Sequence, residues 1–261
     1  MDSSVERAIK FINERYTDPV SLADIADSAI LSRFHFCRTF RDATGVTPGR
    51  FLSAIRIHEA KRMLLNTQMS VSDIASAVGY NSLGSFNNHF TDSVGIPPGR
   101  FRHISRKGRL ESPLPSRVSS SLDAVVTGTI VFPRCHSRAR IFLGAFDTPI
   151  VQRQPSSAVV MEASALAGPV AYQLRGVPHG TWFLRAVAVA EHGDAEPAAP
   201  AVLLVGGSGP VAVTAGAVLS ARIELRPQLP TDLPILLALP EFEPAASTPA
   251  PAPSQPSASR R

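Results

Sequence analysis

Two short stretches of this sequence place guanidinium and amide groups at matching positions around paired phenylalanines. The first, SRFHFCRTFR over residues 32–41, carries three arginines and a cysteine. The second, SLGSFNNHFT over residues 82–91, keeps the Phe-x-x-x-Phe spacing but has two adjacent asparagines and no Lys or Arg. A guanidinium can pair with guanine or phosphate, and an asparagine amide can pair with adenine. Both patterns therefore point to contacts with nucleic acid.

These stretches belong to an internal repeat in the first half of the chain. SLADIADSA at 21–29 matches SVSDIASAV at 70–78, and residues 32–51 match residues 82–101. The offset rises from 49 to 50 between the two matches, so one residue is inserted in the second copy, around Gly79. The clearest pairs are Phe36 with Phe86, Phe40 with Phe90, Gly45 with Gly95, Pro48 with Pro98, and Arg50-Phe51 with Arg100-Phe101.

Each copy predicts a helix, a turn and a second helix. A serine followed three residues later by Asp opens the first helix of each copy, which is a capping-box arrangement. The paired phenylalanines stand at i and i+4 and bury one face of each second helix. The expected caps are Ser21 and Ser70 for the first helices, Ser32 and Ser82 for the second helices, and Gly45 and Gly95 at their C-terminal ends.

A longer helix is expected between the two copies, over residues 48–67, with Pro48 near its first position. At 1.5 Å per residue it spans about 28 Å. That length is comparable to the roughly 34 Å between successive major-groove faces on one side of B-DNA. The helix is thus expected to set the spacing of the two copies.

The ordered motifs resemble the DNA-binding domain of the AraC/XylS family of bacterial transcription regulators over about residues 3–103. They are S-L-x-x-I-A and S-x-x-x-F-x-R-x-F-R-x-x-x-G-x-x-P in copy one, R-I-x-x-A-K-x-x-L-L between the copies, and S-x-x-D-I-A-x-x-x-G-Y, F-x-x-x-F and G-I-P-P-x-x-F-R in copy two. The resemblance implies two helix-turn-helix subdomains joined by a helix. Each would insert a recognition helix into adjacent major-groove segments of double-stranded DNA.

The resemblance also implies which residues contact DNA. The family usually has basic residues where this chain has Asn88 and Thr91. Copy one would then anchor through charge, while copy two either reads adenine or has lost direct readout and only packs against the DNA backbone. The predicted DNA-binding residues are Arg33, Phe34, Cys37, Arg38 and Arg41 in copy one, and Ser82, Leu83, Ser85, Asn87 and Asn88 in copy two.

Charge is distributed unevenly along the chain. Residues 1–110 contain 15 Lys and Arg against 10 Asp and Glu, so the whole formal surplus of +5 lies there. A polyanionic partner is therefore favoured for the first half only. Two cysteines, Cys37 and Cys135, fall in different halves and indicate no disulfide framework. With no signal-peptide pattern and no apolar run fit to span a membrane, we expect a cytoplasmic protein without membrane contact.

The second half alternates apolar and polar residues in short runs separated by Gly, Pro and Asp. This pattern predicts an all-β antiparallel sandwich. VTGTIVF and the later LRGVPHGTWFLRAVA loosely resemble a prealbumin-like, carboxypeptidase-regulatory sandwich. The full expectation is a two-domain chain with an all-α double helix-turn-helix domain at 1–104, a linker at 105–121, the β-sandwich at 122–240, and a disordered Pro/Ala-rich tail at 241–261.

No catalytic constellation is evident, so we expect neither an enzyme nor a cofactor or metal site. DNA-repair chemistry at a reactive cysteine is disfavoured, because neither cysteine lies in an activating motif. The leading hypothesis is a sequence-specific transcription regulator with RNA polymerase as a further partner. Its β domain would bind a small-molecule effector or mediate self-association. The alternative is a β-sandwich module that binds protein or carbohydrate and carries a degenerate DNA-binding domain.

Overall fold

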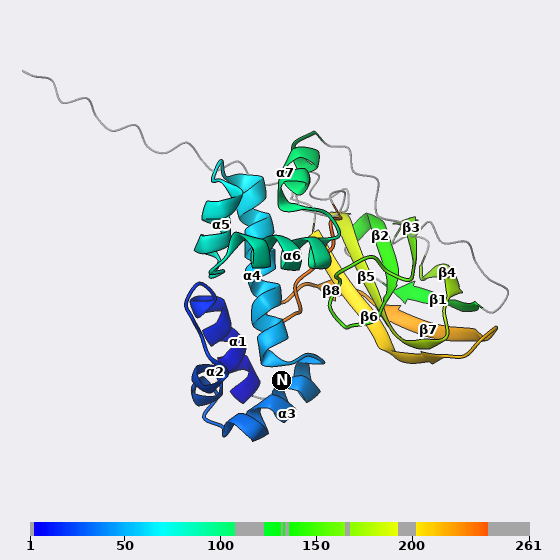
Figure 1. Ribbon diagram of the computed structural model, residues 1–261. Helices are drawn as coiled ribbons and strands as arrows, with labels where there is room; N and C mark the ends of the chain where they lie inside the picture. Colours follow the sequence, from blue (N-terminus) through cyan, green and yellow to red (C-terminus); the bar gives the residue numbers. More distant parts are fainter. Residues whose placement is uncertain are drawn as a thin grey trace, which may run out of the picture.

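The computed structural model describes residues 3–107, 123–131, 133, 136–164, 168–192 and 202–239. Residues 105–107 of the expected linker at 105–121 form the end of helix α7 (Pro98–Lys107). The rest of that linker, the expected tail at 241–261 and Cys135 lie outside the described residues. The described part consists of a helical region and a β region that pack side by side (Figure 1).

The helical region has seven helices, with the two repeat copies at different heights along the long helix α4 (Figure 1). Copy one pairs α2 with α3, and copy two pairs α5 with α6, as the repeat predicts. The helices are α1 (Ser3–Arg15), α2 (Leu22–Ser28), α3 (Arg33–Thr44), α4 (Pro48–Asn66), α5 (Val71–Ala77), α6 (Leu83–Val94) and α7 (Pro98–Lys107).

Phenylalanines form the same packing unit in both copies. Phe36 and Phe40 of α3 are fully buried, with ring centroids 5.4 Å apart, and Phe40 meets Phe51 of α4 edge-on at 5.5 Å. In copy two the corresponding centroid distances are 5.6 Å within α6 and 5.8 Å from α6 to α7. Burial of these large rings helps to hold α3 and α6 in place. The predicted aromatic face is confirmed.

Three of the four predicted serine caps form. Ser21 makes the complete capping box with Asp24, Ser70 accepts from the backbone N–H of Asp73, and Ser82 accepts from that of Ser85. The sequence predicts the same cap from Ser32 on α3, but the Ser32 side chain accepts no hydrogen bond from the helix. That prediction is wrong, although Ser32 does occupy the extended N-cap conformation.

The inserted residue of copy two lies slightly later than the sequence suggests. Leu31 donates its backbone N–H to Ala26 O, and Tyr80 donates in the same way to Ala75 O. The two turns therefore correspond residue by residue as far as Tyr80, and the extra residue is Asn81. Ile30 and Gly79 hold the left-handed conformation at equivalent places, with φ of 59° and 85°.

The β region contains two sheets. One has the strand order β4-β1-β7 and the other β3-β2-β5-β6-β8. The strands are β1 (Ala124–Val131), β2 (His136–Phe146), β3 (Ser157–Ser164), β4 (Val170–Val177), β5 (Gly180–His192), β6 (Val202–Val213), β7 (Val218–Glu224) and β8 (Arg226–Pro227).

Both sheets contribute to one apolar core, which includes Val126 of β1, Ile141 of β2 and Leu184 of β5. Antiparallel pairing holds within the larger sheet and between β1 and β4, but β1 and β7 pair in parallel, which departs from the expected all-antiparallel arrangement. The alternating runs that the sequence predicts as strands are 124–132, 138–146, 159–163, 180–191, 202–205, 210–216 and 217–226, so β4 is not among them. β6 is one strand where the sequence predicts two.

Residues 231–239, here called the C-terminal strap, lie between the larger sheet and the helices. Leu236 and Ala238 belong to the helical core. Leu237 and Leu239 belong to a separate cluster with Phe142, on the face of the sheet that is turned away from the other sheet. An extended chain points successive side chains to opposite sides, so one segment contributes to both cores.

Candidate nucleic-acid interface

The first recognition helix, α3, presents its predicted contact residues to solvent. Phe36 and Phe40 turn inward, and the helix therefore directs Arg33, Phe34 and Arg38 outward, where all three are exposed. Phe34 is 88% exposed, which is unusual for an aromatic side chain on a packed helix. It offers an apolar surface suited to a thymine methyl.

The arginines of this face are available for a ligand. Arg33, Arg38 and Arg41 are exposed and have no carboxylate partner among the described residues. Cys37 is half-buried and lies on the same helix. All five residues predicted in copy one therefore lie on one helix, four of them exposed.

The second recognition helix, α6, presents uncharged groups at the equivalent places. Ser82, Leu83, Ser85 and Asn88 are exposed, and Asn87 is half-buried. Leu83, Asn87 and Asn88 line a surface hollow of about 680 Å³, together with Thr91 and Asp92 of the same helix, Val71 of α5 and residues 97–99 at the start of α7. This surface can donate and accept hydrogen bonds but has no cation to neutralise a phosphate.

Some cations of the helical region serve its fold. Arg56 of α4 donates to the backbone oxygens of Tyr16 (2.7 Å) and Asp18 (2.8 Å), and burial lowers its pKa. Arg102 of α7 donates to the backbone oxygen of Met69 at 2.6 Å. The positive surplus of the first half therefore overstates the charge that is free to meet a polyanion.

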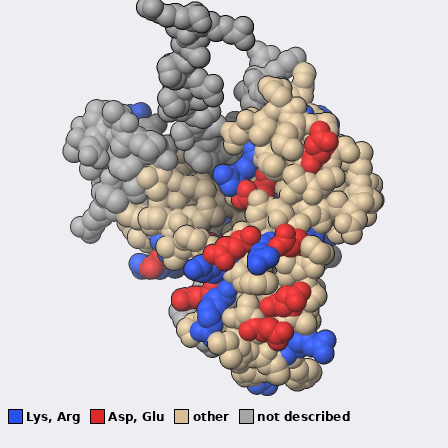
Figure 2. Space-filling view, turned by 90° about the vertical axis from the view of Figure 1, so that its left-hand side faces the viewer, with Lys and Arg blue, Asp and Glu red and all other residues tan. Residues whose placement is uncertain are grey.

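Charged side chains are unevenly spread over the side of the helical region that faces away from the β region. Acidic and basic groups are intermixed over its lower part, at the height of α1 and α3 in Figure 1 (Figure 2). Few charged groups lie over its upper part. The difference matches the sequence, in which α3 has three arginines and α6 has none.

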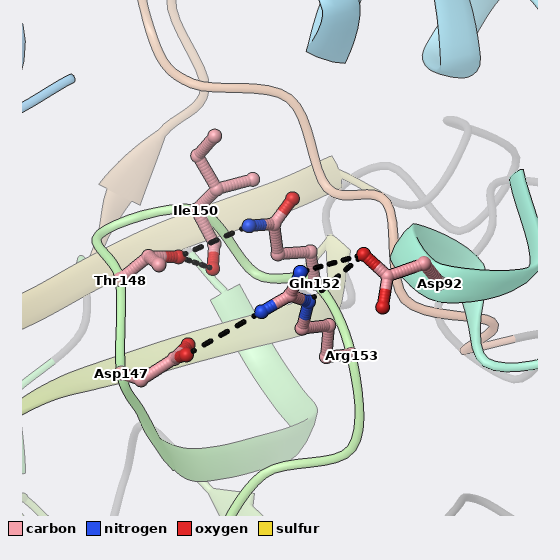
Figure 3. Close-up of polar contacts among 6 residues, drawn as sticks. All are labelled: Asp92, Asp147, Thr148, Ile150, Gln152 and Arg153. Atoms are coloured by element: carbon pink, nitrogen blue, oxygen red, sulfur yellow. Dashed lines mark hydrogen bonds and ion pairs between the residues drawn. The ribbon is translucent and has the colours of Figure 1, made fainter. Parts of the chain in front are cut away.

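The one acidic residue of α6, Asp92, is held by an arginine from the β region. Arg153 donates from Nε (3.1 Å) and Nη2 (2.6 Å) to Asp92 Oδ2, and its Nη1 lies 3.7 Å from Asp147 Oδ2 (Figure 3). The bond to Asp92 raises the pKa of Arg153. This ion pair offsets the only carboxylate of the second recognition helix. Sequence reasoning missed it, because the partners lie 61 residues apart in different regions.

Comparison with known proteins assigns this part of the chain. A family model described as "Helix-turn-helix domain" matches residues 25–104. These residues are an AraC-type helix-turn-helix domain. The lactose operon transcription activator of Staphylococcus xylosus is 30% identical over 103 residues, which are 40% of this chain and 37% of that protein.

The bifunctional transcriptional activator/DNA repair enzyme AdaA of Bacillus subtilis (strain 168) is 31% identical over 102 residues, 39% of this chain and 48% of that protein. The DNA-binding domain of AdpA, solved in complex with a target DNA, is 27% identical with a TM-score of 0.39, over 41% of this chain and 96% of that one. The chain thus spans less than half the length of these two curated relatives, and the AraC-type domain is the shared part.

The remaining predictions concern metal ions, membranes, cellular location and partners. The described residues include no group of three His, Cys, Asp or Glu side chains placed to hold a metal ion. No described helix is long and apolar enough to cross a membrane. The prealbumin-like resemblance of the β region, the cytoplasmic location, the effector and the contact with RNA polymerase stay predictions.

Proposed function

We propose that this protein is a sequence-specific DNA-binding transcription regulator that inserts α3 and α6 into adjacent major-groove segments. The observation that carries the proposal is the AraC-type domain with two equivalent helices that present polar residues on their free faces. Two relatives named as transcription activators support it, as does the AdpA domain, which was solved with a target DNA bound.

The two helices have different tasks in this proposal. Arg33, Arg38 and Arg41 of α3 supply charge for phosphate and donors for guanine. Asn87 and Asn88 of α6 pair with adenine without neutralising phosphate. Affinity and orientation then come mainly from copy one, and copy two adds base discrimination.

Selection of binding sites for the full-length protein from a random duplex library tests this function. The expected motif has two sub-sites about one helical turn apart, as two recognition helices require. A single short half-site would mean that copy two does not read bases. Failure to select any motif at physiological salt would contradict the proposed function and redirect attention to the β region.

A further inference from the structure

The predicted DNA face is the exposed surface that carries Arg38 of α3 and Asn88 of α6. The β region contacts both recognition helices at their C-terminal ends, away from this face. The contacts come from two segments: residues 147–153, here called the bridging loop, and the C-terminal strap. In Figure 1, α3 and α6 both end on the side of the helical region where the β region lies. The N-terminal ends of both helices, with Arg33 and Leu83, lie on the other side.

The attachment to α6 is made of directed polar bonds. Besides the ion pair with Asp92, Arg153 donates its backbone N–H to Ser93 O at 2.8 Å. Ala238 of the strap donates to Val94 O at 3.1 Å. Three consecutive residues in the last turn of α6, Asp92 to Val94, are thus held by the β region. Hydrogen bonds are directional, so these contacts define the orientation of α6 relative to the β region as well as its distance from it.

Arg153 has an uncommon backbone conformation at the point where it contacts α6. Its φ is +60°, in the left-handed region that residues other than glycine rarely occupy. In this conformation its guanidinium reaches Asp92 (Figure 3), and its backbone N–H also reaches the end of α6, at Ser93 O. The bonds to α6 can offset the strain of this conformation, as expected where the surrounding structure holds a residue in a sparsely populated region.

The attachment to α3 uses the same loop but is looser. A Cβ on Gly45, the C-cap of α3, would lie 3.1 Å from Pro149 Cγ, so the loop rests directly against the end of this helix. Beside this contact a hollow of about 410 Å³ is lined by Ala43 and Thr44 of copy one and by Arg185 of β5. Copy two is therefore held to the β region by hydrogen bonds and an ion pair, whereas copy one is held by a packing contact.

The C-terminal strap also contacts α4, the helix between the two copies. Lys61 of α4 is only 4% exposed, and its ammonium donates to the backbone oxygens of Ile235 (3.3 Å) and Leu237 (3.2 Å). The same ammonium lies 5.5 Å from the centroid of the Phe101 ring in α7. One buried cation thereby joins α4, α7 and the strap.

We infer that the bridging loop and the strap form a brace that sets the relative placement of the two recognition helices, with Arg153 and Lys61 as positioning residues. The inference rests on the proposed function. Neither residue lies on the predicted DNA face, so neither is expected to contact bases. The brace therefore affects which spacing between the two DNA sub-sites the protein binds. Two recognition helices held rigidly fit one spacing of the sub-sites, and two helices held more loosely bind several spacings.

The test compares full-length wild type with Arg153→Gly on the selected site and on versions with one base pair inserted or removed between the sub-sites. Glycine accepts the positive φ without strain, so the loop keeps its path while the guanidinium is lost. We expect the wild type to bind the altered spacings about tenfold more weakly than the selected one, and Arg153→Gly to reduce this discrimination to about threefold or less. Thermal melting by circular dichroism confirms that both proteins are folded.

A charge-matched control separates positioning from electrostatics. Arg153→Gly leaves the Asp92 carboxylate without its counter-charge, and the less positive net charge of the protein weakens its long-range attraction to every duplex. The double variant Arg153→Gly with Asp92→Asn has the same net charge as the wild type. Its overall affinity should recover, whereas its relaxed spacing preference should persist. If the double variant regains the spacing preference as well, the effect was electrostatic and the brace is refuted.

The remaining outcomes distinguish the brace from the function on which it rests. If the wild type selects no duplex, the proposed function fails and the brace fails with it. If the wild type selects a two-part site and Arg153→Gly shows the same spacing profile, the brace alone is overturned. A wild type that selects only one half-site also overturns the brace, because there is no spacing to set.

Discussion

At the residue scale, the two recognition helices separate charge from amide chemistry. Arg38 on α3 and Asn88 on α6 are both exposed on the predicted DNA face. The charged Arg38 side chain can neutralise a phosphate and so release counterions from DNA, whereas the uncharged Asn88 side chain cannot. The two contributions are therefore separable by salt, even though substitution of either residue weakens binding.

Substitution of these residues should give different salt dependences. Arg38→Ala should weaken binding and reduce the magnitude of the negative slope of log K against log salt by about one. Asn88→Ala should cost about 1–3 kcal/mol on the best site, relax the preference for adenine and leave the slope unchanged. Fluorescence anisotropy across a salt series measures both. If Asn88→Ala retains the wild-type choice of sites, the adenine contact does not exist.

At the element scale, the repeat gives nearly the same helices with locally different ends. The turns of the two copies share their backbone hydrogen bonds until Asn81 is inserted. After this residue the N-caps differ: the Ser82 hydroxyl accepts from the N–H of Ser85 at 3.2 Å, and the Ser32 hydroxyl accepts from no helix N–H. A satisfied N-cap stabilises a helix by about 1 kcal/mol.

The two serines therefore form a matched pair for a stability measurement. Ser82→Ala should lower the free energy of unfolding by about 1 kcal/mol, and Ser32→Ala should change it by a few tenths at most. Urea unfolding of the full-length protein, followed by circular dichroism of the helices, gives both values. Equal losses in the two variants would contradict the assignment of the caps.

At the scale of the whole molecule, the strap makes the helical and β regions interdependent. Leu236 contributes to the helical core and Leu237 to the cluster on the sheet, and each is only 1% exposed. Neither region can lose the strap without exposing apolar surface. Two regions that share such a segment are expected to unfold together.

Two probes can follow the regions independently. Far-ultraviolet circular dichroism reports the helices, and the fluorescence of Trp182 in β5, the single tryptophan of the chain, reports the β region. In the wild type the two denaturation curves should coincide. Leu236→Ala should cost about 2–5 kcal/mol and move the helical transition to lower denaturant than that of Trp182.

Leu229→Ala serves as the control, because Leu229 is 50% exposed just before the strap. This variant should leave both curves within about 0.5 kcal/mol of the wild type. Separate transitions in the wild-type protein would show that the two regions are independent, against the expected coupling through the strap.

The sequence by itself determined five of the seven described helices, those of the repeat and the helix between its copies. Paired phenylalanines, serine caps, C-cap glycines and the repeat act within a few residues of one another, so their pattern predicts α2 to α6 and the exposed positions of α3 and α6. The second half was less predictable, because alternation does not specify which strands pair. The parallel partnership of β1 with β7 was missed for this reason.

Only the tertiary structure decided how the two regions join. Lys61 meets the strap across 174 residues and Arg153 meets Asp92 across 61, and no local pattern marks such partners. The run Leu233–Leu239 is apolar in sequence, but nothing in it shows that its side chains divide between two cores. That division depends on the position of the sheet relative to α4, which is set by packing distant parts of the chain and not by the strap itself.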